Sequence, residues 1–275
     1  MRILFIGDIV GKPGRDLIRV GLQALVDLHA IDFVIANAEN AAGGFGITRE
    51  IGEQLLDAGI DVMTSGNHIW DKREALDYIG IEPRLLRPAN YPTGVPGNGS
   101  YLARSRSGVS VGVINVMGRV FMLNIDDPFS GVLRQIDTLK NRTRIIFVDF
   151  HAEATSEKLA MGWHLDGKVT AVVGTHTHVQ TADERILPQG TAYLTDAGMT
   201  GPHDSIIGVE IEPALSRFLS ALPSKFETAT ANPRLNGVVV DADEATGRAV
   251  DVERISYSLA ELTELSNAGS LRPTV

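Results

Sequence analysis

The chain contains no cysteine in its 275 residues. Disulfide bonds and thiolate metal sites are therefore excluded, and any metal ion must be bound by histidine, carboxylate or amide side chains. Apolar runs long enough to cross a membrane are also missing, and the N-terminal stretch MRILFIGDIVG lacks the long apolar segment of a signal peptide. We therefore expect a cytoplasmic protein that does not bind membranes.

Positive charge is in deficit, because 25 lysines and arginines face 34 aspartates and glutamates, which gives a net charge of −9. Such a chain has no general attraction to a nucleic-acid backbone, so duplex nucleic acid is not an expected partner. A small phosphorylated ligand remains compatible where a bound metal supplies local positive charge. With 44% hydrophobic residues, the chain can form one large core, and we expect residues 1–275 to be a single domain.

Short apolar runs alternate with amphipathic stretches along the chain, a pattern typical of an α/β fold with a layered mixed sheet. The expected strands are residues 3–7, 32–37, 61–66, 109–118, 144–150, 171–175 and 191–198. The expected helices are residues 15–30, 48–59, 71–79, 130–140, 154–167 and 212–221. Residues 87–100 are rich in proline and glycine and predict a long loop, and residues 237–256 predict an antiparallel hairpin with its turn at 244–247.

Five of the expected strands are followed by residues that can bind a metal ion. These are Asp8, the pair Glu39 and Asn40, the pair Asn67 and His68, His151, and the pair His176 and His178. If the strands run parallel, their carboxyl ends lie at one edge, where α/β proteins bind their ligands. Only three of the seven histidines, His29, His164 and His203, lie elsewhere. We therefore expect the strand-end side chains to converge on one site.

The composition of this set indicates more than one metal ion. An aspartate, a glutamate, two asparagines and three histidines form a mixed nitrogen and oxygen environment that is too rich for one tetrahedral zinc ion. It suits two divalent ions bridged by a carboxylate, an arrangement that serves the hydrolysis of phosphate esters. Such ions lower the pKa of a water molecule and neutralise phosphoryl oxygens. His68 is then free to protonate the leaving oxygen.

Six motifs in order resemble a known family. They are GDIVGKPGR (7–15), NAENAAGGFGIT (37–48), TSGNHIWD (64–71), DFHAEATSEK (149–158), GTHTHVQTAD (174–183) and TDAGMTG (195–201). The set is similar to the calcineurin-like metallophosphoesterases, and within them to the YmdB family of 2′,3′-cyclic-nucleotide 2′-phosphodiesterases. Each motif alone is weak, but six long motifs in the same order are specific.

The resemblance implies a four-layer αββα sandwich with two mixed β-sheets and a dinuclear site. Asp8, Glu39, Asn40 and His178 would hold one ion, and Glu39, Asn67, His151 and His176 the other, so that Glu39 bridges. His68 would be the proton donor. The ions would be two divalent or mixed-valence metals, with iron or manganese favoured and magnesium or zinc compatible. The substrate would be a small phosphoester, a cyclic nucleotide, and a homo-oligomer is compatible with this reading.

The sequence departs from the wider superfamily at two motifs. The usual Asp-x-His is here Asp8-Ile9-Val10, and the usual Gly-Asp-x-x-Asp is replaced by NAEN with Glu39. The first ion loses a histidine nitrogen, which the carbonyl of Asn40 partly replaces.

Several alternatives stay open at this point. Lys12 and Arg15 are either phosphate ligands or a solvated helix start, and Asp196 either orients a ligand histidine or stabilises a turn. Gly174 is expected to give the turn before His176 its freedom. A metal-dependent nucleotide sensor with little turnover, a general phosphomonoesterase and a metal-dependent amidohydrolase are the rival functions. The last is disfavoured because its His-x-His comes early on a barrel of eight βα units, which this sequence does not show.

Overall fold

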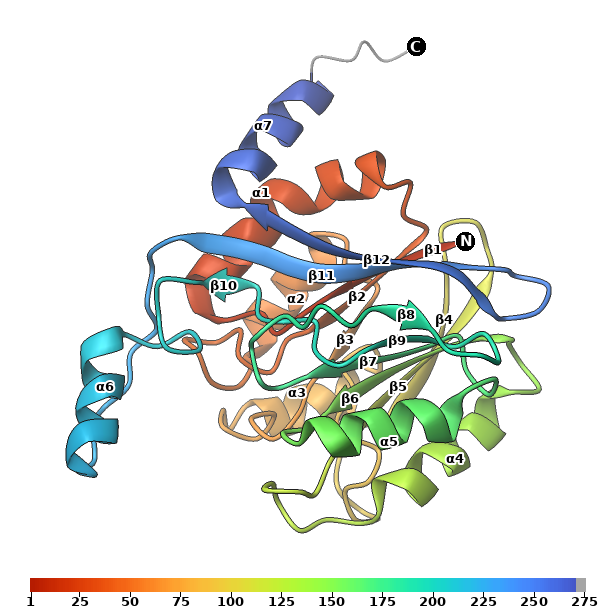
Figure 1. Cartoon of the computed structure of the whole chain (residues 1–275), viewed down its shortest axis with the longest axis horizontal. Helices are drawn as coiled ribbons and strands as arrows, with labels where there is room; N and C mark the ends of the chain where they lie inside the picture. The colour runs from red at the N-terminus through yellow and green to blue at the C-terminus, as the bar shows by residue number, and fades with distance from the viewer. Residues whose placement is uncertain (271–275) are drawn as a thin grey trace.

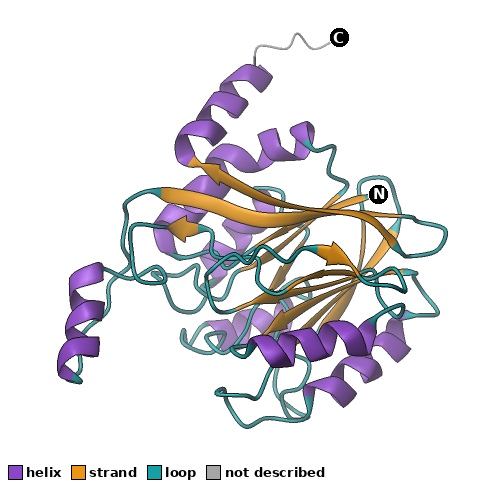
Figure 2. Ribbon diagram, in the orientation of Figure 1, coloured by secondary structure: helices purple, strands orange, loops and turns teal. Residues whose placement is uncertain are grey.

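Two β-sheets lie face to face, with helices on both outer sides (Figures 1 and 2). The computed structural model describes residues 1–270. The layers are helix, sheet, sheet and helix, as the resemblance implied for an αββα sandwich. Across residues 1–270, the structure has no helix that is both long enough and apolar enough to cross a membrane.

The first sheet has the strand order β10-β11-β1-β2-β3, with β12 paired to β11. Its strands are β1 (Arg2–Ile6), β2 (Phe33–Asn37), β3 (Val62–Thr64), β10 (Gly201–Pro202), β11 (Pro233–Ala242) and β12 (Ala249–Ser258). Strands β1, β2 and β3 run parallel, whereas β11 is antiparallel to β1 and β12 is antiparallel to β11. The predicted C-terminal hairpin is therefore confirmed, and it extends the first sheet.

The second sheet has the order β4-β5-β6-β7-β9-β8. Its strands are β4 (Ser100–Arg104), β5 (Ser110–Met117), β6 (Ile145–His151), β7 (Ala171–Thr175), β8 (Arg185–Ile186) and β9 (Ala192–Leu194). The four inner strands are parallel, and the two edge strands are antiparallel to their neighbours. Strands β6 and β7 are buried along their whole length, as continuous apolar runs predict.

The core between the sheets takes side chains from both of them. Phe5 of β1 stacks on Phe147 of β6, with ring centroids 5.1 Å apart. Ile3, Ile35, Val113 and Val173 pack in the same cluster, and each is fully buried. Burial of one such side chain stabilises the fold by about 1.5–3 kcal/mol. This shared core fixes the two sheets relative to each other, and with them the strand ends.

The helices α1 (Gly11–Leu28), α2 (Arg49–Asp57), α3 (Ala75–Ile81) and α7 (Leu259–Ser270) pack on the first sheet. The helices α4 (Pro128–Leu139) and α5 (Thr155–Leu165) cover the second. Helix α2 begins after Thr48, whose hydroxyl accepts a hydrogen bond from the amide of Ile51 at 3.3 Å and so caps the helix. Helix α6 (Ile211–Ser220) stands away from the body at the left of Figure 1.

Candidate metal centre

The predicted ligands come from the strand ends of both sheets, not from one edge of a single sheet. Asp8, Glu39 and Asn67 follow β1, β2 and β3 of the first sheet, while His151 ends β6 and His176 follows β7 of the second. Because the two sheets pack face to face, their carboxyl ends meet. The expectation of convergence therefore holds in space, although the strands belong to two sheets.

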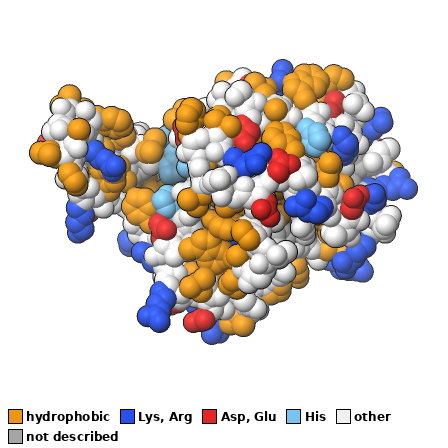
Figure 3. Space-filling model, turned by 90° about the horizontal axis from the view of Figure 1, so that it is seen from below, with side chains coloured by type: hydrophobic (Ala, Val, Ile, Leu, Met, Phe, Trp, Pro, Cys, Tyr) orange, Lys and Arg blue, Asp and Glu red, His pale blue; other side chains and the backbone are white. Residues whose placement is uncertain are grey.

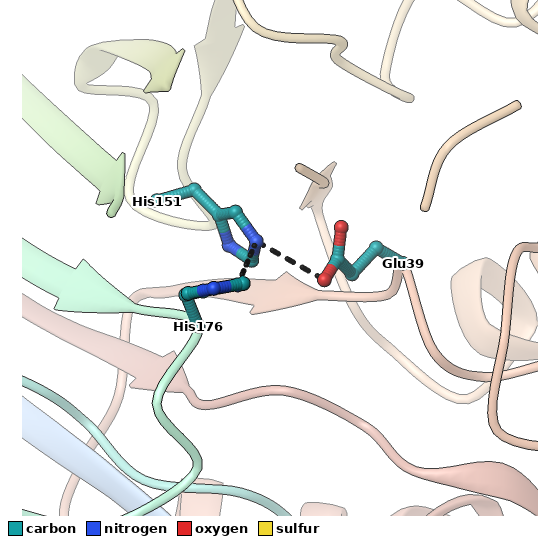
Figure 4. Close-up of side chains that lie close together, drawn as sticks. All are labelled: Glu39, His151 and His176. Carbon is teal, nitrogen blue, oxygen red and sulfur yellow. Dashed lines mark hydrogen bonds and ion pairs between the residues drawn. The ribbon is translucent and has the colours of Figure 1, made fainter. Parts of the chain in front are cut away.

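Three ligand atoms gather around Nε2 of His151. Its Nε2 lies 3.0 Å from Oδ1 of Asn67, 3.1 Å from Oε1 of Glu39 and 3.1 Å from Nδ1 of His176. Figure 4 shows the side chains of His151, His176 and Glu39 pointing toward one another. Glu39, His151 and His176 offer atoms within 4.8 Å of one another, a spacing that could hold a metal ion. These four residues are the set that the resemblance implied for one ion.

A second group lies beside it around His178. The amide nitrogen of Asn40 donates to Nε2 of His178 at 3.2 Å and to Oε1 of Glu39 at 3.3 Å. Oδ1 of Asp8 lies 4.0 Å from Nε2 of His178. Glu39 thus touches both groups, where a bridging carboxylate would have to be. Asp8, Glu39 and Asn40 are almost completely buried.

Each of the three imidazoles has one nitrogen fixed by an acceptor outside the cluster. Nδ1 of His151 donates to Oγ1 of Thr175 at 2.9 Å, Nδ1 of His178 to the carbonyl of Ile207 at 2.8 Å, and Nε2 of His176 to Oε2 of Glu153 at 3.1 Å. The hydroxyl of Thr175 in turn donates to Asp149 at 2.7 Å, so it must accept from His151. The other nitrogen of each ring therefore points inward, which is how protein metal sites orient their histidines.

The donor set of the cluster fits a cation. Among the residues that the structure describes, Oδ1 of Asp8 and Oδ1 of Asn40 are buried and accept no hydrogen bond. Burial raises the pKa of Asp8. Burial lowers the pKa of His151, but the Glu39 carboxylate outweighs it and raises that pKa to about 9, so a proton occupies the cluster when no metal does. Converging acceptors with unsatisfied oxygens are what two bound cations would neutralise.

The turn that carries His176 and His178 is strained at the histidines themselves. His176 has φ 99° and His178 has φ 66°, a region that side chains other than glycine rarely adopt. The prediction that Gly174 supplies the freedom of this turn is wrong. Gly174 lies within β7, and a Cβ there would come 1.8 Å from the carbonyl oxygen of Thr195. A glycine is therefore needed at position 174, where the backbone of β7 passes very close to the backbone of Thr195.

A buried ion pair holds this turn in place. Nζ of Lys158 donates to Oδ2 of Asp196 at 2.6 Å and to the carbonyl of Thr175 at 2.8 Å, and both charged groups are buried. The same carboxylate oxygen accepts from the amide and the hydroxyl of Thr177, the residue between the two histidines. Asp196 therefore positions the histidine-bearing turn through Thr177 and does not contact an imidazole itself.

His68 lies at the rim of the site. Its amide donates to Oε2 of Glu39 at 3.0 Å, its Nδ1 lies 2.8 Å from Oδ2 of Asp71, and its ring stands edge-on to Phe45 with centroids 5.1 Å apart. Because Nδ1 of His68 is hydrogen-bonded to Asp71, the other ring nitrogen remains available to a ligand. His68 lines a pocket together with His176 and His178. The volume of this pocket is about 360 Å³.

Three other residues considered in the sequence analysis, Lys12, Arg15 and His203, do not belong to the ligand cluster. Lys12 pairs with Asp16 at 3.2 Å on the exposed surface of α1, as a solvated helix start would. Arg15 donates to the carbonyl of Ala41 and so supports the loop after Asn40. His203 donates from Nδ1 to the carbonyl of Gly201 at 3.0 Å and faces a second pocket.

Sequence reasoning missed the residues that support the ligands. Thr175, Glu153, Ile207, Asp71 and Lys158 contact ligand side chains or the turn that carries them. Four of them lie within quoted motifs, but only the fold shows which ligand each one meets. Ile207, which lies outside those motifs, has φ 47°, an unusual conformation for a β-branched residue, and its carbonyl orients His178.

Comparisons with known proteins identify the fold and the family. The fold and the site define an α/β protein of the metallophosphoesterase type. A structure described as a novel phosphatase from Mycoplasma pneumoniae matches with a TM-score of 0.88 and 36% identity, over 94% of this chain and 93% of that one. A hypothetical protein from Thermus thermophilus matches with a TM-score of 0.87 and 42% identity, over 94% and 99% of the two chains.

The chain belongs to the family described as YmdB-like protein, whose family model matches residues 4–255. It is 52% identical over 255 residues to a 2′,3′-cyclic-nucleotide 2′-phosphodiesterase of Bacillus subtilis (strain 168), and the match covers 93% of this chain and 96% of that relative. The family resemblance inferred from the six motifs is therefore confirmed.

Proposed function

We propose that this protein is a dinuclear metal-dependent phosphodiesterase that hydrolyses 2′,3′-cyclic nucleotides at the 2′ ester. The observation that carries the proposal is the orientation of the three imidazoles. One nitrogen of each ring is hydrogen-bonded to an acceptor outside the cluster. The other nitrogen of each ring faces Glu39 or another ligand of the cluster. The name of the Bacillus subtilis relative supports the choice of substrate.

In this proposal Asn67, His151 and His176 hold one ion, Asp8, Asn40 and His178 hold the other, and Glu39 bridges them. Asn40 contributes its carbonyl oxygen after a flip of its side-chain amide, which exchanges the positions of Oδ1 and Nδ2. Mixed nitrogen and oxygen donors of this kind favour iron or manganese. When bound, the ions would activate a water molecule and neutralise the phosphoryl oxygens.

His68 is the proton donor in this scheme. Water adds to phosphorus and releases one proton to the solvent, the bond between phosphorus and O2′ breaks, and O2′ leaves with a proton from His68. The product is a nucleoside 3′-phosphate. Asp71, 2.8 Å from Nδ1 of His68, orients the ring so that the other ring nitrogen can face the pocket. The hydrogen bond from the backbone amide of His68 to the carboxylate of Glu39 keeps the ring beside the ligand cluster.

The test is an assay of the manganese- or iron-loaded protein on 2′,3′-cyclic adenosine phosphate, a linear diester and a monoester. We expect the cyclic diester to be the best substrate and His68→Ala to lower kcat by about 10²- to 10⁴-fold without loss of metal. His164→Ala, a histidine on α5 away from the site, is the matched control. Bound metal without turnover of any phosphoester would favour the sensor, and preference for the monoester would favour the phosphomonoesterase.

A second test concerns the division of the ligands. Because His176 and His178 contact different groups, His176→Ala and His178→Ala are each expected to lower the metal content from about two ions to about one. Elemental analysis of the purified variants measures this. Loss of both ions in both variants, or of neither, would contradict separate ions for the two histidines.

A further inference from the structure

One half of the pocket above the ligand cluster is apolar. Glu39, Asn40, His176 and His178 form its polar end. Its apolar wall is formed by Val10, Phe45, Ile207, Val209 and Phe226. The volume of about 360 Å³ lies within the range of about 300–1,000 Å³ that small-ligand pockets occupy. The pocket therefore offers both polar and apolar contacts to one ligand.

Phe226 reaches this wall from a segment whose following residues are bound to Gly208 and Val209. Val209 forms an isolated antiparallel bridge with Thr228, and the amide of Ala229 donates to the carbonyl of Gly208 at 3.0 Å. The side chain of Thr228 fits closely between two glycines, because a Cβ on Gly11 or on Gly44 would come 2.7 Å from it. Gly44 directly precedes Phe45, so this contact brings the two phenylalanines to the same pocket.

The ring of Phe226 is also supported from behind. The guanidinium carbon of Arg217, on α6, lies 5.3 Å from the ring centroid and covers one face. Phe226 lines the pocket, whereas Arg217 is not among its lining residues. Figure 3 shows α6 projecting from the body with histidine side chains near its base. Helix α6 thus supports Phe226 through Arg217.

We propose that the apolar half of the pocket, between Phe45 and Phe226, holds the nucleobase of the substrate, which stacks on Phe226. This inference rests on the proposed function and adds how the substrate is recognised. The five wall residues carry no side-chain hydrogen-bonding group. The base is therefore bound by stacking and apolar contact, which accept every base because each has a flat face. Cyclic nucleotides with all four bases should be substrates, with purines modestly preferred.

The test compares two substrates that share the reacting group. They are adenosine 2′,3′-cyclic phosphate and methyl riboside 2′,3′-cyclic phosphate, which has no base. Phe226→Ala is expected to lower the ratio of their kcat/KM values by about 5- to 100-fold, the range that loss of one stacked aromatic gives. Phe226→Tyr should retain the ratio because the ring remains. Phe218→Ala, which removes an 80% exposed phenylalanine of α6, is the matched control and should leave the ratio unchanged.

An unchanged ratio in Phe226→Ala would overturn the proposed subsite while leaving the hydrolase in place. Failure of the wild-type protein to hydrolyse either substrate would instead contradict the proposed function. In that case calorimetry on the manganese-loaded protein decides the subsite by itself. Adenosine 3′-phosphate should bind more tightly than ribose 3-phosphate, and Phe226→Ala should remove the difference. Equal binding of the two phosphates by the wild-type protein would refute the subsite.

Discussion

Lys158 and Asp196 allow a quantitative test of how the histidine-bearing turn is held. The two groups meet at 2.6 Å, and their side chains are 1% and 0% exposed. Lys158→Met removes the ammonium group and leaves the carboxylate of Asp196 buried without a counter-charge. Breaking a buried pair in this way costs about 3–5 kcal/mol of the free energy of unfolding. This is a large share of the roughly 5–15 kcal/mol that stabilises a typical domain.

The chain offers a matched surface pair. Lys140 and Asp137 also meet at 2.6 Å, but their side chains are 55% and 66% exposed. Lys140→Met should therefore cost only about 0–1 kcal/mol. Urea unfolding of both variants, followed by circular dichroism, measures the two free energies. Equal losses in the two variants would refute the reasoning that burial decides the strength of the pair.

The same substitution should also weaken metal binding, because Asp196 holds Thr177 between His176 and His178. Loss of a residue that orients metal ligands typically lowers metal affinity by about 10- to 100-fold. Manganese titration of Lys158→Met against the wild-type protein measures this change. Unaltered affinity in a destabilised variant would show that the ion pair serves the fold alone.

Two further predictions concern a glycine and a carboxylate. Gly66→Ala should reduce metal content, because the new Cβ would come 2.1 Å from the ring of His151, whereas Gly80→Ala, with no atom within 4 Å, should have no effect in the same elemental analysis. Burial raises the pKa of Asp183, but donors led by the Thr195 hydroxyl outweigh burial and hold this pKa below its ordinary 3.8. Its stabilisation is therefore present above that pH and is lost as the pH falls. Asp183→Asn should destabilise the protein in urea at pH 7 and progressively less near pH 3, and an equal loss at both pH values would contradict this.

The ligands could be predicted from the sequence because they follow apolar runs, and runs of this kind form buried parallel strands. Asp8 and His176 lie 168 residues apart in the chain, yet the backbone amide of His176 donates to Oδ2 of Asp8 at 3.3 Å. The sequence pattern predicted this convergence, although the pattern by itself did not show that the strand ends belong to two sheets. Face-to-face packing brought the ends together as one edge would have done.

The support of the site could not be predicted, because it depends on contacts between distant elements. Lys158 appears on α5 as an ordinary helix residue, and only the fold brings it to Asp196. Helix α7 was missed for a similar reason. Its Leu262 packs on Gly21 of α1, where a Cβ would come 2.5 Å from the leucine. Short edge strands such as β4, β8 and β10 also depend on their neighbours for hydrogen bonds and carry little pattern of their own.

The most direct test of the central claim is the anomalous scattering of crystals of the manganese-loaded protein. The account predicts two peaks about 3.5–4 Å apart with Glu39 between them. One peak should contact Asn67, His151 and His176, and the other Asp8, Asn40 and His178. A single peak, or two peaks that do not share Glu39, would contradict the dinuclear site.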